Sequence, residues 1–497
     1  MVLKVKFTLF VFFLFLNVIF MFGSLSDVRN GVKSFKLKNG MKFILFERHK
    51  VPVVSFVTFV NVGSVNEPKG ETGITHVFEH MAFKGTRVIG TVDYKKEKPI
   101  LDDMDKVFEE ILAIQDGDDE NLKREKLPVL KKKFRELQKE AEKYVVNNEF
   151  MRILNENGAE GTNAQTTSDY TAYFINLPSN KAELWAYMES DRILNPVMRE
   201  FYKEKEVIKE ERRMRVESNP IGKLIEEVQC TAFQAHPYHH PTIGFMSDIE
   251  HATRDEVRKL HDRYYCGKNI TIAVVGDITL KELKKLADKY FSKIPSGEVK
   301  DEYITPEPPQ RSKKIIEMKS DAQPLVLMCF HRPQLNSPEN FIFDALTDIL
   351  SGGNSSVLYK KLVIEEKKAI AVGALSGFPG NKYPNLYIVY AFPSNGVDAN
   401  DLLKRLEDEL FRLKKEKVSE KELERVKKRE KLMLVESLSS NQEMAFNLAY
   451  YETIGGGWEN LFDSLKRIDR ITPEDILDVA NKYFKEENMI IGILNKK

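Results

Sequence analysis

Two histidines and a glutamate lie close together in the first fifth of the chain, at His76, Glu79 and His80. On an α-helix, residues four apart lie on one face, with their Cβ atoms roughly 6 Å apart. The two imidazoles can therefore bind one metal ion while the carboxylate lies beside it. These are the groups that a zinc-dependent hydrolytic site needs, and the segment predicts such a site.

The order H-x-x-E-H is the inverted zincin signature, but a short motif needs support from its structural context. With 9 histidines and 75 acidic residues in 497 positions, about 0.02 matches are expected by chance in such a chain. The alternative interpretation is an ordinary helix with two half-buried histidines and a solvated glutamate. The low chance frequency favours the metal site.

A third ligand is expected elsewhere, because a catalytic zinc usually takes three protein ligands and keeps a fourth position open. In the acidic helix predicted over residues 200–214, a helical wheel gives an inward stripe of Phe201, Val207, Ile208 and Met214. Glu204 and Glu211 fall within that stripe, and buried carboxylates require a cation or a hydrogen-bond partner. We predict Glu211 as the ligand and Glu204, two turns earlier, as a group that holds either an imidazole or the water network beside the metal. The alternative is an internal salt bridge to an arginine.

A second histidine-rich segment, 236–241, contains His236, His239 and His240. Its two prolines prevent a regular helix, so these histidines share no helical face. We therefore expect a loop on the substrate side rather than a second metal site.

Length and composition limit the classes of protein to consider. The chain has 497 residues, 42% of them hydrophobic, with 76 basic and 75 acidic side chains and a net charge of +1. The length predicts several domains, and the balanced charge gives no reason to expect nucleic acid as a partner. Three cysteines, far apart in the sequence, form neither a disulfide framework nor a cysteine metal site.

The N-terminus differs from the rest of the chain. Lys4 and Lys6 precede an apolar run over residues 7–22, and small residues follow up to Ser26. This pattern is typical of a secretory signal with cleavage near Ser26, and the alternative is an uncleaved membrane anchor. We therefore expect an exported protein in the periplasm or another extracytoplasmic compartment, either released or attached to the membrane.

An internal duplication is visible in the second part of each half. Residues 253–273 and 472–492 repeat each other at an offset of 219 positions, which aligns Tyr264 with Tyr483. Both segments read as a helix, a polar turn and a strand. The duplication predicts an α+β fold of two homologous α/β-sandwich domains, each with an antiparallel-rich sheet and helices on one face. Further strands are expected at 43–46, 53–62, 171–177, 270–275, 325–329 and 387–391.

The predicted organisation is a leader over residues 1–26, a first domain over 27–295, a proline-rich linker over 296–313 and a second domain over 314–497. Within the first domain, the highly charged stretch over about 93–150 has apolar residues at helical spacing. It predicts an inserted helical hairpin. The hairpin either shapes access to the site or is a solvated arm without a catalytic part.

The segment 76–86, the helix that carries Glu204 and Glu211, and the duplicated halves together resemble the pitrilysin/insulinase family of zinc metallopeptidases, the inverzincins. The resemblance covers nearly all of the chain after the leader and is greatest to bacterial processing-peptidase-like members. It implies one Zn²⁺ per chain, with Glu211 as the third ligand. It also implies that Asn163 and Ala164 lie on an edge strand that pairs with the substrate backbone. Without the resemblance these two residues would be interpreted as structural.

Two features depart from the family pattern. His80 and Glu211 are 131 positions apart, more than in compact relatives, and the hairpin accounts for the excess. Active members also carry an Arg and a Tyr, seven residues apart in the second half, that bind the substrate carbonyl. Residues 362–372 offer neither, so a companion chain supplies the pair or zinc alone polarises the carbonyl. The segment 344–350, where a second metal helix would fall, has no histidine, which again predicts one zinc per chain.

The predicted function is zinc-dependent endopeptidase activity on peptides or extended, unfolded segments, with Glu79 as the general base. One alternative is a non-catalytic partner subunit or scaffold of a two-chain, processing-peptidase-like complex. Another is a chaperone-like protein that binds extended chains at Asn163 and Ala164 without cutting them. The expected partners are a peptide or unfolded substrate and a second subunit, in a homodimer or in a heterodimer with a related chain.

Overall fold

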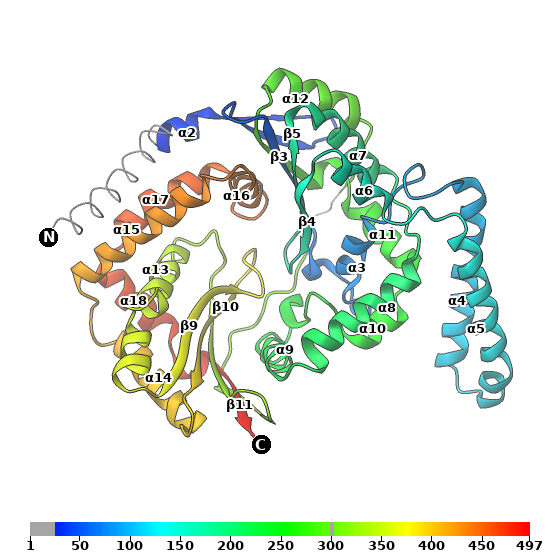
Figure 1. The fold of residues 1–497 in the computed structure, drawn as a ribbon. Coiled ribbons are helices and arrows are strands. Elements are labelled where there is room, and N and C mark those ends of the chain that lie inside the picture. The colour runs from blue at the N-terminus through cyan, green and yellow to red at the C-terminus, as the bar shows by residue number, and fades with distance from the viewer. Residues whose placement is uncertain (1–24, 299–302) are drawn as a thin grey trace, which may run out of the picture.

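The computed structural model describes residues 25–298 and 303–497, which form two similar halves, each built around one β-sheet (Figure 1). Most of the predicted leader and residues 299–302 of the predicted linker lie outside the described residues. Within the described part of the chain, no helix is long and apolar enough to cross a membrane.

The first sheet has six strands in the order β1-β2-β6-β3-β5-β4. Their bounds are β1 Val32–Lys36, β2 Lys42–Glu47, β3 Val53–Val60, β4 Glu160–Thr166, β5 Thr171–Pro178 and β6 Ile270–Gly276. β2 and β6 pair in parallel, and every other neighbouring pair is antiparallel. The four strands predicted from sequence in this half are confirmed, and β4 lies at the edge of the sheet.

The second sheet has five strands in the order β7-β11-β8-β10-β9. Their bounds are β7 Lys314–Ser320, β8 Leu325–Arg332, β9 Ala369–Phe378, β10 Asn385–Pro393 and β11 Met489–Lys496. Only β7 and β11 pair in parallel. The order and directions match β2-β6-β3-β5-β4 of the first sheet. The repeated segments form the same unit twice, α11 (Arg254–Tyr264) before β6 and α18 (Pro473–Tyr483) before β11. The predicted fold of two homologous domains is confirmed.

The helices of each half cover one face of its own sheet, as predicted, and bury an apolar core there. In the first half these are chiefly α3 (Ile74–Met81), α7 (Ala182–Leu194), α8 (Phe201–Arg212), α11 and α12 (Leu280–Leu286). In the second half they are α13 (Asn340–Ser351), α14 (Ala399–Arg412), α15 (Glu420–Ser437) and α18. Trp185 of α7 stacks on Phe56 of β3 with ring centroids 3.9 Å apart, which fixes helix against sheet.

The opposite face of each sheet receives a helix from the other half. α16 (Asn441–Thr453) of the second half packs on β3 and β6, where Leu448 is fully buried in one cluster with Val57. α9 (Pro220–Ala232) of the first half packs on β7 and β11, where Leu224 and Val228 are buried. Since each helix completes the core of the other half, neither sheet is covered on both faces by its own half alone.

The remaining helices are short or peripheral. They are α2 (Leu25–Gly31), α6 (Glu149–Glu156), α10 (Met246–His251) and α17 (Glu459–Arg470). Short segments of 3₁₀ or π geometry are η1 (Ser64–Asn66), η2 (Ser179–Lys181), η3 (Arg213–Glu217), η4 (Pro237–His239), η5 (Gly267–Asn269), η6 (Ala287–Phe291), η7 (Tyr359–Glu365) and η8 (Glu486–Asn488).

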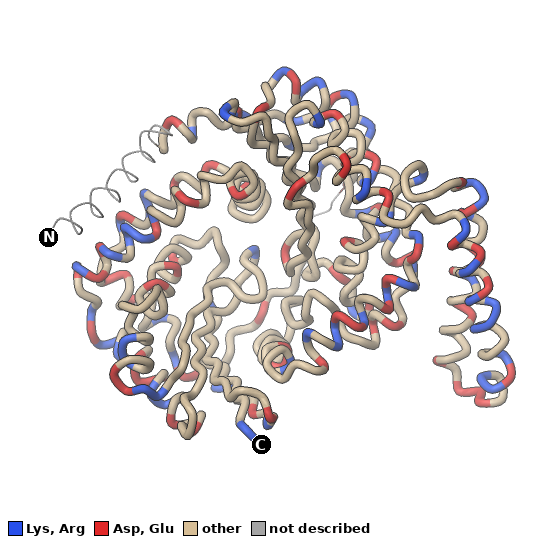
Figure 2. The backbone as a smooth tube through the Cα atoms, viewed as in Figure 1, with Lys and Arg blue, Asp and Glu red and all other residues tan. Residues whose placement is uncertain are grey.

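The predicted helical hairpin is present as α4 (Tyr94–Asp116) and α5 (Glu120–Glu142), an arm that projects from the first half (Figure 1). Basic and acidic residues are interspersed along it (Figure 2). Its base is anchored by the fully buried pair of Arg199 and Glu97, with Nε and Oε1 2.9 Å apart. Arg199 also donates to the carbonyl oxygens of Lys84, Thr86 and Ile89, so the arm is fixed to the loop that follows α3.

Because α16 packs on the sheet of the first half and α9 on the sheet of the second, we expect the two halves to unfold together. Leu448→Ala should lower the free energy of unfolding by about 2–5 kcal/mol, because it leaves a cavity where α16 meets the first sheet. Calorimetry and guanidinium unfolding should show a single transition, and its midpoint should be lower than in the wild type. Met433→Ala on α15, where the side chain is 52% exposed, is the control and should change the stability by about 0.5 kcal/mol or less. Two separate transitions, of which only one moves, would contradict this coupling.

Candidate metal centre

The helix that carries the histidines is held at its N-terminus by a buried acid. Glu67 accepts hydrogen bonds from the backbone N–H groups of Gly73 and Thr75, both at 2.8 Å. A carboxylate there satisfies N–H groups that have no partner within the helix and interacts favourably with the helix dipole. Gly73 has φ of 91°, and an added Cβ would lie 2.6 Å from the carbonyl oxygen of Ile243, so only glycine fits.

The histidine-rich segment 236–241 supports this cap. His240 Nε2 lies 3.2 Å from Glu67 Oε2 and donates to the carbonyl oxygen of Ser64 at 2.8 Å. The prediction that these histidines do not share a helical face holds, because η4 is a three-residue turn that begins at Pro237 and has His236 as its N-cap. In the described part of the chain, one cluster alone brings three or more potential ligand side chains together, and it contains none of them.

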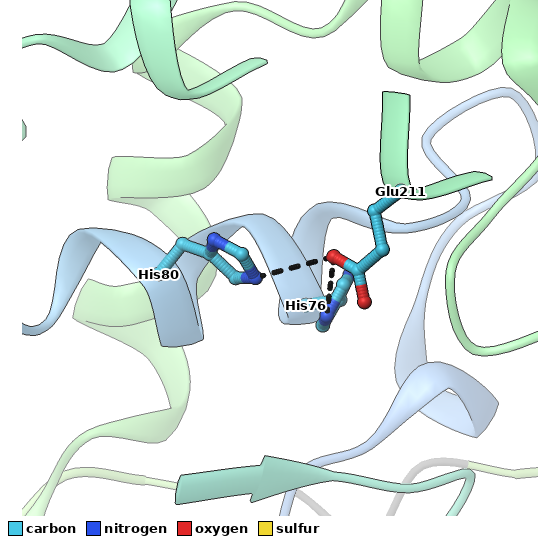
Figure 3. A group of neighbouring side chains, drawn as sticks. All are labelled: His76, His80 and Glu211. Atoms are coloured by element: carbon cyan, nitrogen blue, oxygen red, sulfur yellow. Dashed lines mark ion pairs between the residues drawn. The ribbon is translucent and has the colours of Figure 1, made fainter. Parts of the chain in front are cut away.

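That cluster consists of His76, His80 and Glu211, the three ligands predicted from sequence. The histidines project from α3 and the glutamate from α8, which packs against it (Figure 3). Glu211 Oε2 lies 3.9 Å from His76 Nε2 and 3.6 Å from His80 Nε2. All three ligand atoms lie within 4.8 Å of one another. The fold therefore brings together side chains that are 131 positions apart in the sequence.

The residues fit a zinc ion in donor type and spacing. Two imidazole nitrogens and a carboxylate oxygen are a donor set that catalytic zinc sites use. With bonds of about 2.1 Å and tetrahedral angles, neighbouring ligand atoms around zinc lie about 3.4 Å apart. The two nitrogen–oxygen separations exceed that value by about half an ångström or less, and the donor atoms, which lie within 4.8 Å of one another, would move closer together around a bound ion.

The second oxygen of Glu211 is held by an arginine. Arg215 Nη2, from η3, lies 2.7 Å from Glu211 Oε1. The salt bridge that was the alternative interpretation of Glu211 thus exists, but it uses only the oxygen that faces away from the histidines. Arg215 therefore helps to direct Oε2 toward them.

The surroundings shift the pKa values of the two histidines in opposite directions. Burial, with the positive charges of His80 and Arg215, lowers the pKa of His76 to about 3, so this imidazole is neutral at pH 7 and can bind a cation. Burial also acts to lower the pKa of His80, but the hydrogen bond and charge of Glu204, with the charges of Glu79 and Glu211, raise it overall. The raised pKa favours the protonated form of His80, so a metal ion that binds this imidazole would have to displace a proton from it.

Glu204 lies where the sequence placed it, beside His80 and behind the donor cluster. His80 Nδ1 donates to Glu204 Oε1 at 3.0 Å, and Lys84 Nζ lies 2.6 Å from Glu204 Oε2. Burial acts to raise the pKa of Glu204, but the hydrogen bonds from His80 and Lys84 outweigh it and lower the pKa to about 2. The carboxylate is therefore ionised and fixes the orientation of the imidazole, with Nε2 toward Glu211.

The helical wheel was wrong for two of the four residues it placed on the inward face. Phe201 and Ile208 are buried, but Val207 is 49% exposed and Met214 is 69% exposed. Lys205 and Arg212 are buried instead, with Lys205 Nζ donating to the carbonyl oxygens of Glu250 and Ala252. A hydropathy pattern places charged residues on the surface, so it does not predict a buried lysine or arginine whose hydrogen bonds are all made within the protein. Met214 also lies in η3, where π geometry changes the rotation per residue.

Glu79 lies beside the donor cluster and is not part of it. Its Oε2 accepts a hydrogen bond from Thr166 Oγ1 at 2.7 Å. Burial raises the pKa of Glu79, and the bonds from Thr166 and the positive charge of His80 only partly offset that effect. A carboxylate with a raised pKa is a stronger base, which suits proton transfer near neutral pH. Thr166 lies at the end of the predicted edge strand, but no pattern in the sequence indicated its contact with Glu79.

Asn163 and Ala164 lie on β4, the edge strand that ends at Thr166. They pair with Phe174 and Tyr173 of β5, next to an irregularity in the ladder between Glu160 and Asn163. The Ala164 N–H is bonded to the Asn163 side-chain oxygen at 2.9 Å. A largely apolar cavity opens beside this strand, lined by Phe83, Phe150, Leu154, Thr162, Asn163, Tyr173, Phe174, Ile175, Trp185, Met188, Glu189 and Arg192.

Two family models match the chain. The model described as Insulinase (Peptidase family M16) matches residues 42–97 and 137–245. The model described as Peptidase M16 inactive domain matches residues 251–430. The gap in the first match falls on the hairpin arm. All three donor residues lie within the insulinase match, and the match to the inactive-domain model begins after them.

Relatives and solved structures agree with these matches. The chain is 28% identical over 462 residues to Zinc protease PqqE of Helicobacter pylori, covering 91% of this chain and 90% of that one. It is 22% identical to Uncharacterized zinc protease YmxG of Bacillus subtilis, covering 92% and 96%. A crystal structure of a protease from Helicobacter pylori superposes with a TM-score of 0.76 at 24% identity, covering 93% and 99%. The first half of the periplasmic protease PqqL from Escherichia coli has a TM-score of 0.68 at 17% identity, covering 94% and 92%.

The contact between Glu204 and His80 leads to a test by metal titration. Glu204→Gln should weaken zinc binding about 10- to 100-fold, because the neutral amide no longer holds the imidazole as a charged acceptor does. Competition with a chromophoric chelator measures the affinity. Glu206→Gln on the same helix, where the side chain is 63% exposed, is the matched control and should leave the affinity unchanged. Equal zinc affinities for both variants would show that Glu204 does not orient His80.

Proposed function

The chain belongs to the insulinase family of peptidases, M16, and from this premise we propose that it is a zinc-dependent endopeptidase. The observation that carries the proposal is the convergence of His76, His80 and Glu211 within 4.8 Å, with Glu79 beside them. The relatives named zinc proteases support the choice of metal. One zinc ion per chain is proposed, because the described residues contain one such cluster.

The chain's own residues supply the proton transfers. Zinc, when bound, supplies a Lewis acid that polarises a peptide carbonyl and lowers the pKa of water. Glu79 takes the proton from the attacking water and returns it to the departing amine. Burial favours this role because it raises the pKa of Glu79 toward the working pH, and Thr166 fixes one carboxylate oxygen.

The proposed substrates are peptides and extended, unfolded segments. β4 is paired on one side only, by β5, so a substrate strand can add to its free edge beside Asn163 and Ala164. Such pairing needs a fully extended backbone, which a folded domain does not offer.

A non-catalytic partner subunit is the second candidate function. It is favoured by residues 362–372, which lack the expected Arg and Tyr and form the end of η7 and the start of β9. The inactive-domain model, however, matches only residues 251–430, outside the donor cluster. An intact donor set together with a buried base argues for activity. Assembly with a second copy or a related chain remains part of the proposal for either candidate.

We also propose that the protein works outside the cytoplasm. The support is the N-terminal sequence pattern, and one structural neighbour is titled a periplasmic protease. Fractionation of cells that express the full chain tests this, with the chain expected in the periplasmic or membrane fraction. Recovery of the uncleaved chain from the cytoplasm would contradict it.

Glu79→Gln should retain zinc and lose hydrolysis. The amide keeps the size of the side chain but takes no proton, so kcat should fall by about 10²- to 10⁴-fold. Zinc content and cleavage of an unstructured peptide, followed by mass spectrometry, are measured on the same preparation. Glu210→Gln, an exposed neighbour of the ligand Glu211, should remain active. A fully active Glu79→Gln variant would remove Glu79 from the mechanism.

Removal of the metal should abolish cleavage reversibly. A chelator should stop hydrolysis of casein and of short peptides, and one equivalent of zinc per chain should restore it, because the donor set holds one ion. Metal analysis before and after dialysis gives the stoichiometry. Peptide that binds but is never cut, with or without zinc, would instead support the peptide-binding scaffold.

A further inference from the structure

The hydrogen bond between Thr166 and Glu79 connects the base to the edge strand. Thr166 Oγ1 donates to Glu79 Oε2 at 2.7 Å, and the Thr166 backbone amide also interacts with the same carboxylate. Thr166 is the last residue of β4. β4 has a neighbouring strand on one side only, so the sheet alone does not fix the position of Thr166 firmly.

The turn that follows Thr166 is fixed by contacts outside the sheet. The Thr167 and Ser168 carbonyl oxygens accept hydrogen bonds from the N–H groups of Ser64 and Val65, at 3.1 and 3.0 Å. Ser64 and Val65 belong to η1, which ends just before Glu67, the residue that caps α3. The turn and the start of α3 are therefore held by the same segment.

The same turn is bound by a loop from the second half. Asp169 is only 2% exposed, and its Oδ2 accepts hydrogen bonds from the backbone N–H groups of Asn381 and Lys382, at 2.5 and 3.0 Å. Its Oδ1 accepts a hydrogen bond from the Tyr238 hydroxyl. Asn381 and Lys382 lie in the connection between β9 and β10. A buried carboxylate is thus satisfied largely by backbone groups of the other half.

Close packing leaves this contact little freedom. A Cβ added at Gly380 would lie 2.6 Å from both Asp169 Oδ2 and the Tyr238 hydroxyl oxygen. Lys382 Nζ also donates to Asn61 Oδ1 at 2.8 Å, just beyond the end of β3. The loop therefore contacts the first half at several points. One of them, Asp169, is three residues after Thr166 in the chain.

We propose that Thr166 is a positioning residue for Glu79, and that the second half sets its position by binding Asp169 through the loop between β9 and β10. The inference rests on the proposed peptidase function. The second half, which has no metal ligands, would thereby take part in the reaction. Its loop between β9 and β10 orders the turn after Thr166, and this turn positions the Thr166 hydroxyl that holds Glu79.

Replacement of the hydroxyl tests the first step. Thr166→Val keeps the shape and removes the donor, so kcat should fall about 10- to 100-fold, as expected for a misplaced catalytic group. KM and zinc content should stay within about twofold of wild type, because neither substrate pairing nor the donor cluster uses the hydroxyl. Thr166→Ser restores the donor and should recover most of kcat. A Val variant with wild-type kcat, or a Ser variant as slow as the Val variant, overturns the proposal.

A substitution in the second half tests the coupling without touching the metal site. Gly380→Ala should displace the loop from Asp169 and lower kcat with zinc content unchanged. Gly117→Ala at the tip of the arm, where the nearest atom to an added Cβ is 3.3 Å away, is the matched control and should behave as wild type. Gly380→Ala with unchanged kcat, or with a change in KM alone, contradicts the coupling. If zinc-loaded wild type cleaves no peptide, the proposed function itself fails, which is distinct from these outcomes.

Discussion

The site depends on one constraint: α8 must pack across α3 so that three donor atoms meet. His76 and His80 are neighbours on α3 by helical geometry, but Glu211 reaches them only because α8 packs across α3. Bringing these polar groups together out of water costs free energy unless each is paired. Glu204, Lys84 and Arg215 supply that pairing around the cluster, and Glu67 fixes the start of α3.

The second half contributes to this constraint although the cluster contains none of its residues. α16 completes the core beneath the first sheet, and the loop between β9 and β10 binds the turn that follows the edge strand. In the second half α13 follows β8 as α3 follows β3, but there Asp348 pairs with Arg429, with oxygen and nitrogen 3.0 Å apart. The duplicated fold has thus kept its packing in both halves and the donor cluster in one.

Local patterns in the sequence were sufficient for the fold class and for much of the site. The spacing of His76, Glu79 and His80 follows from one helical turn. Glu204 and Glu211, both partly buried, were placed on the inward side of α8 by a helical wheel that was right only for Phe201 and Ile208 among its four apolar residues. The repeat near the end of each half predicted two similar sheets, and apolar residues at helical spacing within a highly charged stretch predicted the arm. In each case the signal lies within one element or one repeat.

Features that depend on contacts between distant elements could not be predicted. Val207 and Met214 are exposed because Lys205 and Arg212 occupy the buried face and bond to backbone and acidic partners. The exchange of α9 and α16, the cap by Glu67 and the bond from Thr166 to Glu79 each join segments with no shared pattern in the sequence. They follow from how the two halves dock, which hydropathy and spacing do not determine.

The proposed chemistry requires one metal ion held by His76, His80 and Glu211. Anomalous diffraction at the zinc absorption edge, from crystals of the zinc-loaded protein, tests it most directly. We expect a single strong peak per chain, about 2.0–2.2 Å from His76 Nε2, His80 Nε2 and one oxygen of Glu211. A zinc-loaded crystal with no peak there, or with its peak at another group of residues, would contradict it.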